Sequence, residues 1–371
     1  METMNIAVIL SHFDKSGVTY NTFDLCEGLS QIGQNVTLVI SKPRSKEEEE
    51  RVSHLQKHGV KFIFFNPLYG SFKNKIRGFL KILKVVLSKK FDVIHFESIY
   101  LTFIPWLVGR KAVLTYHSYG LRKKFESKNV TRLIAISKEI KDDAMERHGY
   151  SDDQIDIVHH GVSRKFSEPK SQEQIEEIKR RLDIPTDKII ISIVGSIQPR
   201  KGHHFLLEAI NKFPDSLKEQ IHIVFCGNPL PDPDNYDWIN EQISKNGLKD
   251  KVTLISHCDT TDIYPIIDIF CLPSVWEGFP LVTLEAMMAG CAVLRSNVQG
   301  ASEQIIEGVT GWTFQSENPL ALSEKLFYLV ENPEERIKLG KNAKKYALEH
   351  FTVTEMAKNT LKVYEKVISK K

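Results

Sequence analysis

The sequence has few of the features that mark secreted, membrane-spanning or zinc-stabilised proteins. Its five cysteines form no CxxC pair, and several lie in apolar runs; they are residues 26, 226, 258, 271 and 291. We therefore expect neither a disulfide framework nor a zinc site. The start, METMNIAVIL, lacks the basic residues, long apolar run and cleavage site of a signal peptide. No stretch approaches ~18 consecutive apolar residues, so a cytoplasmic protein is expected.

Several catalytic patterns are also missing from the sequence. It contains no P-loop and no Ser-His-Asp arrangement, and clusters such as HGYSDD and GHH lack metal-ligand spacing. Asp232 and Asp234 form a D-x-D pair, a pattern that holds manganese in other proteins, but here the pair lies in a proline-rich loop. We therefore expect no metal and no cofactor.

Charge is distributed unevenly between the two halves of the chain. Residues 1–170 contain 27 Lys and Arg against 19 Asp and Glu, a balance of +8, whereas the whole chain is only +3. The balance indicates an anionic partner for the first half alone. A nucleic acid is not expected to be that partner.

Short apolar runs, rich in β-branched residues, alternate with amphipathic segments along almost the whole chain. Such runs are typical of parallel strands covered on both faces, so the alternation predicts an α/β fold with doubly wound sheets. The expected strands are residues 5–10, 35–40, 60–65, 92–96, 111–117, 132–137, 155–160, 188–196, 221–227, 251–256, 268–274 and 291–296.

The alternation is interrupted at residues 163–187, a charged segment with two prolines and no expected strand. A chain of 371 residues also exceeds what one core usually organises. We expect two Rossmann-like domains, at 1–165 and 166–352, facing each other across a cleft. A last helix, at 353–371, is expected to pack back on the first domain. Open α/β sheets bind ligands at the carboxyl ends of their strands, so the chemistry is expected on strand-to-helix loops.

The most specific pattern lies at residues 272–290, LPSVWEGFPLVTLEAMMAG. Glu277 falls in the loop after an expected strand, and Glu285 falls about one turn into the following helix. The N-terminus of a helix offers unpaired N–H groups to a phosphate or a sugar oxygen. A carboxylate beside it can accept hydrogen bonds from a ribose diol. This pattern fits a ligand that carries phosphate and sugar hydroxyl groups.

The segment resembles the E-x7-E signature of retaining glycosyltransferases of the GT-B fold, family four (glycosyl transferases group 1). Further blocks stand in the family's usual order, at 195–210, 225–229, 252–270 and 298–314. The likeness is close in the second half and looser in the first. It implies transfer of a hexose-type sugar from a nucleotide sugar, a UDP-sugar in preference to a GDP-sugar. The acceptor would be a glycan, a lipid-linked molecule or another component of the cell envelope, and retention without a metal is implied.

The resemblance also implies roles for individual residues. Arg200 and Lys201 would clamp the donor pyrophosphate, which suits a guanidinium fork beside an ammonium group. With Glu277 and His117, which ends an expected strand in the first half, they form the implied catalytic set. The implied donor-binding residues are Gly17, Gly195, Ser196, Gly227, Ser256, His257, Gly278, Phe279, Pro280, Leu281, Val282 and Glu285.

Plainer interpretations of these residues stay open. Arg200 and Lys201 also fit a solvated pair before a helix, the glycines fit ordinary turns, and His117 fits a satisfied histidine at a strand end. Two departures from the family are visible. Pro280 stands where many relatives have glycine, which removes one N–H donor, and Gly17 stands alone where the family usually has paired glycines.

Residues 71–91, SFKNKIRGFLKILKVVLSKKF, combine apolar residues at helical spacing with seven positive charges and no acid. Two interpretations stay open. The helix is either an ordinary surface helix of the first domain or a contact with an anionic membrane that places the enzyme, as a peripheral protein, beside a lipid-linked acceptor. The basic residues Arg122–Lys124 favour the second.

Two other functions are compatible with the same architecture. One is a GT-B-like sugar-nucleotide epimerase, and the other is a catalytically inactive scaffold that binds a glycan or a partner protein. The combination of His117, Arg200, Lys201, Glu277 and Glu285 favours a transferase over both.

Overall fold

The computed structural model describes residues 3–14, 16–66, 72–99, 102–118, 130–230, 232–256 and 259–369. The chain divides into two compact units. The first unit is Met1–Val162 with Phe351–Lys371, and the second is Ser163–His350. The division after Val162 lies three residues before the predicted boundary at 165/166, and the chain re-enters the first unit two residues before the predicted boundary at 352/353.

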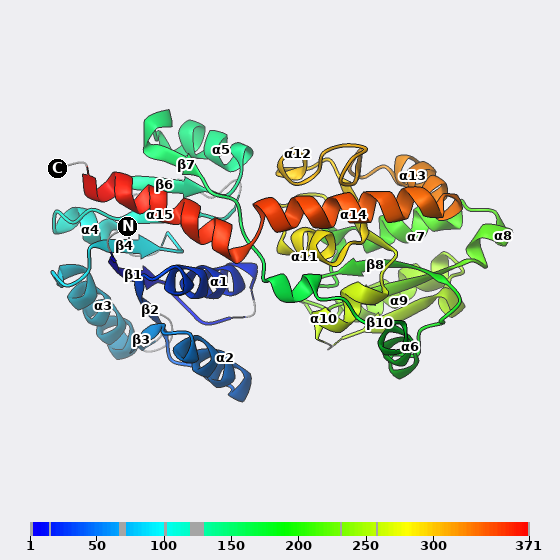
Figure 1. Cartoon of the computed structure of the whole chain (residues 1–371). Helices are drawn as coiled ribbons and strands as arrows, with labels where there is room; N and C mark the ends of the chain where they lie inside the picture. Colours follow the sequence, from blue (N-terminus) through cyan, green and yellow to red (C-terminus); the bar gives the residue numbers. More distant parts are fainter. Residues whose placement is uncertain are drawn as a thin grey trace. The chain divides into compact units, whose positions relative to one another are not determined.

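The described part of the first unit contains a seven-stranded parallel sheet in the order β3-β2-β1-β4-β5-β6-β7 (Figure 1). Val8 of the central strand β1 lies opposite Leu38 of β2 on one side and His95 of β4 on the other. The strands are β1 Asn5–Ile9, β2 Asn35–Ser41, β3 Lys61–Phe65, β4 Val93–Phe96, β5 Val113–Tyr116, β6 Arg132–Ala135 and β7 Ile155–Ile157.

Helices cover both faces of this sheet. Along the chain, the sheet grows from β1 toward one edge up to β3, and the connections from β3 to β7 then run toward the opposite edge. Because such crossovers are right-handed, the change of direction places α1 and α2 on one face of the sheet and α3 and α5 on the other. The helical segments are α1 Gly17–Gln31, α2 Lys46–Lys57, α3 Phe72–Leu87, α4 Phe103–Leu107, α5 Lys138–His148, η2 Asp152–Gln154 and α15 Val353–Ser369.

The second unit repeats the plan with a six-stranded parallel sheet in the order β10-β9-β8-β11-β12-β13. Its apolar core is separate from that of the first unit and is built around residues such as Ile191, Leu206 and Phe225. The strands in this part of the described chain are β8 Ile189–Val194, β9 Ile221–Cys226, β10 Val252–Ile255, β11 Ile269–Leu272, β12 Ala292–Ser296 and β13 Trp312–Phe314.

Crossovers in opposite directions from β8 place α7 and α9 on one face of the second sheet and α11 on the other. The helical segments of this unit are η3 Arg164–Ser167, α6 Gln172–Arg181, η4 Pro199–Lys201, α7 His203–Asn211, α8 Asp215–Lys218, α9 Asn235–Lys245, η5 Lys249–Lys251, α10 Thr260–Ile263, η6 Tyr264–Ile266, α11 Leu281–Ala289, α12 Ala301–Gln304, α13 Pro319–Glu331 and α14 Pro333–His350.

The sequence analysis identified twelve of these strands but drew several of them too long. The segments expected at 111–117 and 155–160, for example, are strands only over Val113–Tyr116 and Ile155–Ile157. Two elements were not expected. Strand β13 has only three residues, and helix α6 lies inside the charged segment at 163–187.

The last helix, α15, packs on the first unit beside α1 (Figure 1). Where the chain re-enters this unit it pairs with the segment that leaves it: Val162 N–H donates to Phe351 O (2.8 Å) and Val353 N–H to Val162 O (3.2 Å). Further along the helix, Tyr364 is fully buried and its hydroxyl lies 2.7 Å from Nδ1 of His95 on β4. Helix α15 therefore completes the core of the first unit.

No helix in the described ranges has both the length and the apolarity that crossing a bilayer requires.

The packing of α15 is testable with a pair of neighbouring variants. Leu361 is 2% exposed within the core of the first unit, whereas Lys362 is exposed. Leu361→Ala should lower the free energy of unfolding by about 2–5 kcal/mol, because it leaves a cavity. Lys362→Ala should change it by no more than about 0.5 kcal/mol. Urea denaturation of both variants checks this, and equal effects would contradict the packing described.

Candidate functional site

The two central strands of the second sheet, β8 and β11, are neighbours whose following connections run in opposite directions. Open α/β sheets bind ligands at such a switch point, beside the carboxyl ends of the strands. The loop after β8 carries Arg200 and Lys201, and the loop after β11 carries Ser274, Trp276 and Glu277. The fold thus brings the two sequence blocks to one edge of the sheet.

Gly202 lets these two loops touch. Its φ is +74°, and a Cβ there would lie 1.9 Å from the carbonyl oxygen of Pro273. A side chain would therefore both strain the backbone and collide with the neighbouring loop. The contact is completed by Val275 N–H, which donates to the carbonyl of Arg200 at 2.9 Å.

A buried ion pair lies at the centre of this contact. Glu277 is 7% exposed, and its Oε1 accepts hydrogen bonds from Lys201 Nζ (2.6 Å) and Ser274 Oγ (2.7 Å). Its Oε2 lies 3.7 Å from Nη1 of Arg200. Burial alone would raise the pKa of Glu277, but the charges of Lys201 and Arg200 outweigh it, so the pKa lies below its ordinary value. Glu277 is therefore a carboxylate that positions two cations.

Arg200 is held by its other contacts in a defined orientation. Nη1 donates to the carbonyl of Trp276 at 2.9 Å, and the guanidinium lies 4.2 Å from the centre of the Trp276 ring. A guanidinium has five N–H donors, and about a quarter of the side chain is exposed. Arg200 is thus fixed in place with donor capacity left for an anion.

Glu285 lies on α11, whose first N–H groups lack intrahelical partners. Its Oε2 accepts a hydrogen bond from Tyr264 Oη at 2.6 Å. Burial raises the pKa of Glu285, and the bond from Tyr264 opposes that rise. Helix α11 follows Gly278, the buried Phe279 and the N-cap residue Pro280, and it begins with Leu281 and Val282.

Sequence reasoning missed the residues that support this loop. Arg295 is fully buried and donates to Gln304 Oε1 and to the carbonyl of Gln299. Gln304 in turn donates from Nε2 to the carbonyl of Pro280 at 3.1 Å. These residues and Tyr264 lie outside the motif in sequence, and no local pattern links them to it.

The predicted residues at the other strand ends are placed as follows. Gly227 and Gly195 lie against each other, because a Cβ on Gly227 would lie 1.8 Å from the carbonyl oxygen of Gly195. Ser196 Oγ accepts from Gln198 Nε2 at 2.5 Å. Ser256 is exposed directly after β10, and His257 lies outside the described residues.

The first unit has a cavity of about 380 Å³ at the equivalent place. It is lined from the ends of β1, β4 and β5 by residues that include Ser11, Glu97 and His117. The order β2-β1-β4-β5 makes β1 and β4 the switch point of this sheet. The cavity has room for part of a small polar molecule.

A buried carboxylate orients His117 at this cavity. Glu97, which is 1% exposed, places Oε2 2.6 Å from His117 Nε2, and His117 Nδ1 lies 3.2 Å from His160 Nε2. Oε1 of Glu97 has no hydrogen-bond partner in the described part of the structure and lies 3.4 Å from His95 Nε2. Burial would raise the pKa of Glu97, but the histidines lower it overall. Glu97 was not predicted from the sequence.

In the loop after β1, the carboxylate of Asp14 is bound by neighbouring residues of the chain. Asp14 accepts from the hydroxyls of Ser16 (2.6 Å) and Thr19 (2.5 Å), and lies 2.9 Å from His12. Burial would raise the pKa of Asp14, but these contacts lower it strongly. Gly17, the first residue of α1, is exposed, and a Cβ there would meet nothing within 4 Å. Packing in this unit gives no reason for a glycine at position 17.

Comparison with protein families agrees with this arrangement. The family described as Glycosyltransferase Family 4 matches residues 15–166, and the family described as Glycosyl transferases group 1 matches residues 174–346. The chain belongs to the family-four glycosyltransferases of the GT-B fold. The first match covers the first unit from residue 15 to the point where the chain leaves it, and the second match covers most of the second unit.

Individual relatives of this glycosyltransferase are distant. It is 27% identical over 226 residues to D-inositol 3-phosphate glycosyltransferase of Corynebacterium glutamicum, a match that covers 59% of this chain and 53% of the relative. The chain spans about half to two thirds of the length of the curated relatives it matches.

Two solved structures share the fold of the glycosyltransferase over nearly the full chain. A glycosyltransferase from Rickettsia africae superposes with a TM-score of 0.86 at 20% identity, and the match covers 100% of both chains. HepE of Anabaena, solved in complex with UDP-glucose, gives a TM-score of 0.82 at 16% identity, over 98% of this chain and 100% of that chain. Both comparisons support the GT-B fold.

The role of Glu97 can be tested through pH. Its pKa in the folded glycosyltransferase lies below the ordinary 4.5, so its contribution to stability is complete well above that pH and is lost as pH falls through the lowered pKa. Glu97→Gln should lower the free energy of unfolding at pH 7 by about 3 kcal/mol. The difference from the wild type should shrink in acid. Urea denaturation at pH 7 and pH 4 measures both values.

The matched control is Glu146→Gln on the exposed side of α5. It removes the same charge without a buried partner and should change stability by no more than about 0.5 kcal/mol. A Glu97→Gln penalty that is the same at both pH values would show that the carboxylate charge does not act through its histidine neighbours.

Proposed function

We propose that this protein transfers a hexose from a nucleotide sugar, a UDP-sugar in preference to a GDP-sugar, to a hydroxyl of an envelope-type acceptor. The observation that carries the proposal is the pair Arg200 and Lys201, held by buried Glu277 at the switch point of the second sheet. A planar fork beside a point charge suits two adjacent phosphates. The UDP-glucose bound by the structurally similar HepE supports the choice of donor.

The rest of the donor would lie along the start of α11. Glu285 would accept hydrogen bonds from the ribose hydroxyls, and the bond from Tyr264 Oη to its Oε2 would hold the carboxylate in place. N–H groups of the loop and of the first helical turn would bind the phosphate or the sugar. Pro280 offers no N–H, so the number of donors to the sugar is reduced by one there.

For the chemical step we propose front-face displacement with retention of configuration. The leaving phosphate, stabilised by Arg200 and Lys201, would accept the proton of the attacking hydroxyl. Stabilising charge that develops on a leaving group is the largest catalytic contribution in many enzymes. The two side-chain cations take the part that a divalent metal plays elsewhere, so transfer should not need a metal. In the first unit, the cavity beside His117, which Glu97 orients, would admit the acceptor.

Loss of the Arg200 guanidinium should weaken nucleotide binding. A charge-assisted hydrogen bond is worth about 1.5–3 kcal/mol, so Arg200→Ala should raise the Kd for UDP by about 10- to 150-fold. Glu285→Ala should also weaken UDP binding, through the ribose. Arg180→Ala, an exposed arginine on α6, is the matched control and should leave the affinity unchanged. Titration calorimetry measures all three.

Unchanged UDP affinity in both site variants would remove this assignment. A protein that binds the nucleotide sugar but interconverts it without an acceptor would be an epimerase. One that binds it without turnover would be a scaffold. Assays of transfer, epimerisation and hydrolysis on one sample therefore separate the three functions.

We further propose that α3 contacts an anionic membrane and brings the enzyme to a lipid-linked acceptor. At 100° per residue its exposed apolar residues fall within about 80° of one another; they are Phe72 (77% exposed), Ile76, Leu80 and Leu87. Gly78, Ile82, Val85 and Val86 are buried, so they form a separate, inward face. Exposed Trp106 and Leu107 lie on α4, which packs beside α3.

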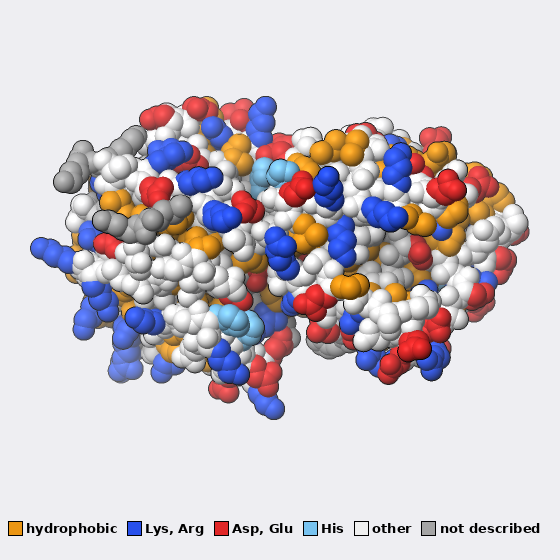
Figure 2. All heavy atoms as spheres, in the orientation of Figure 1, with side chains coloured by type: hydrophobic (Ala, Val, Ile, Leu, Met, Phe, Trp, Pro, Cys, Tyr) orange, Lys and Arg blue, Asp and Glu red, His pale blue; other side chains and the backbone are white. Residues whose placement is uncertain are grey.

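Positive charges flank this apolar face. Lys73, Lys75, Arg77, Lys81 and Lys84 on α3 are all exposed, and Figure 2 shows Lys and Arg side chains gathered over the region where Figure 1 labels α3. Exposed apolar side chains bordered by cations are typical of helices that lie in an anionic bilayer surface. The basic residues Arg122–Lys124 lie outside the described residues.

Removing charge from α3 should weaken membrane binding without unfolding the protein. Each Lys near an anionic surface contributes about 1 kcal/mol, so replacing Lys73, Lys75 and Lys81 with Gln should lower affinity for phosphatidylserine vesicles by about two orders of magnitude. The same replacement of the exposed residues Lys212, Lys245 and Lys249 in the second unit is the matched control. Vesicle sedimentation at low salt measures both. Equal losses, or no binding by the wild type, would contradict the proposal.

A further inference from the structure

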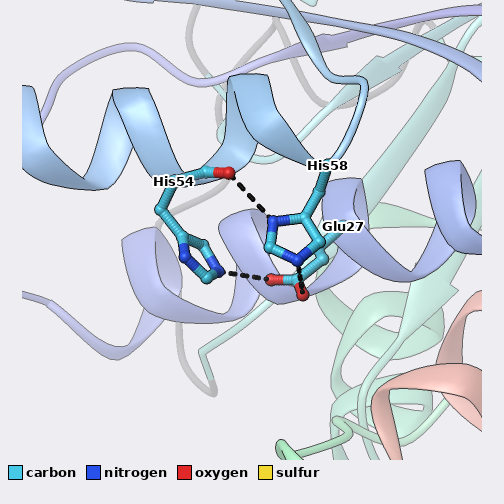
Figure 3. Close-up of side chains that lie close together, drawn as sticks. All are labelled: Glu27, His54 and His58. Carbon is cyan, nitrogen blue, oxygen red and sulfur yellow. Dashed lines mark hydrogen bonds and ion pairs between the residues drawn. The ribbon is translucent and has the colours of Figure 1, made fainter.

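A cluster of metal-ligand side chains lies on the first unit where α1 meets α2. Glu27 comes from α1, and His54 and His58 come from α2, four residues apart and therefore on one side of that helix (Figure 3). The ligand atoms of the three residues all lie within 4.8 Å of one another, and among the described residues no other group of three or more meets that criterion. All three side chains reach solvent: they are 21%, 60% and 36% exposed.

The distances in the cluster do not fit hydrogen bonds. His54 Nε2 lies 3.4 Å from Glu27 Oε2, and His58 Nε2 lies 3.7 Å from Glu27 Oε1. Hydrogen bonds between nitrogen and oxygen are about 2.7–3.2 Å long. In a tetrahedral zinc site with bonds of about 2.0–2.1 Å, neighbouring ligand atoms are about 3.3–3.4 Å apart. The two nitrogen-to-oxygen distances, which involve different oxygens of the carboxylate, are close to that spacing.

Hydrogen bonds with neighbouring groups orient His58 and Glu27, as such bonds orient the ligands of known metal sites. His58 Nδ1 lies 2.9 Å from the carbonyl of His54, so Nδ1 donates to that carbonyl and Nε2 is the ring nitrogen that faces Glu27. Glu27 Oε1 also accepts a hydrogen bond from Gln31 Nε2 at 3.0 Å. Outer contacts of this kind fix the orientation of metal ligands.

We propose that Glu27, His54 and His58 bind one divalent transition metal ion, zinc in preference to magnesium or calcium, with water completing the coordination. Two imidazole nitrogens and one carboxylate suit zinc, whereas magnesium and calcium take oxygen ligands. The sequence analysis missed this site, although His54 and His58 stand at a spacing that metal ligands use, because the third ligand comes from another helix.

The site is structural. Glu27 lies ten residues beyond the start of α1, which is ~15 Å along the helix from the cavity end. Only Val52 and Leu55 of α2 are buried, so few apolar contacts hold α2 in place. A bound ion joins α2 to α1. The site is independent of the donor site in the second unit.

The test titrates the full-length protein, freed of metal by chelator, with zinc chloride in a calorimeter. The His54→Ala, His58→Ala double variant should lose this binding event, with affinity at least about 100-fold weaker, since even outer-shell contacts are worth 10- to 100-fold. His350→Ala is the matched control, because His350 is exposed and belongs to no group of three metal-ligand side chains among the described residues. It should bind zinc as the wild type does.

Thermal melting gives a second measurement that does not depend on activity. Zinc should raise the Tm of the wild type and of His350→Ala, and leave that of the double variant unchanged. Absence of zinc binding by the wild type, equal binding by the double variant, or equal binding of magnesium would overturn the proposal. UDP affinity should be the same with and without zinc, so failure here is distinct from failure of the proposed function.

Discussion

A buried carboxylate needs partners that compensate its charge, and both units of this protein supply such partners at the same place in their sheets. In the second unit Glu277, in the loop after β11, holds Lys201 and Arg200, which follow β8. In the first unit Glu97, directly after β4, holds His117, which follows β5. Each glutamate thus follows the fourth strand of its unit, the strand paired with the first. Because an uncompensated buried charge is strongly destabilising, the functional side chains are oriented by the same interaction that stabilises the loops carrying them.

This dependence explains what the sequence could and could not predict. Apolar runs predicted the parallel strands because burial on both faces requires continuous apolarity. Three-residue β13 escaped notice because its residues, Trp312–Phe314, are too few to form a run. Helix α6 was missed because its capping box at Ser171 and Gln174 lies within a charged segment that also reads as a linker.

The candidate site was predictable only where its residues are neighbours in sequence. The segment around Glu277 and Glu285 is a local pattern, whereas Glu97, Tyr264 and Arg295 act through partners far along the chain or on other elements.

The role of the glycines at strand ends was predicted only in part. Gly227 was predicted to bind the donor, yet a backbone oxygen of the protein itself already requires a glycine there, at 1.8 Å from an added Cβ, as another does at Gly202, at 1.9 Å. A glycine at a strand end can therefore serve loop packing as well as ligand approach.

Helix α15 belongs to the first unit but follows the second unit in sequence, so the first unit is completed last during synthesis. Residues of the second unit run without interruption from Ser163 to His350, so all of them are synthesised before α15. The first unit starts the chain but must wait for Val353–Ser369 to cover Cys26, Leu29 and the rest of its apolar surface beside α1. Domains generally fold in the order of their synthesis. Here the unit synthesised first is the one whose core closes last, and a nascent chain that stalls before residue 353 carries one finished unit and one with an uncovered core.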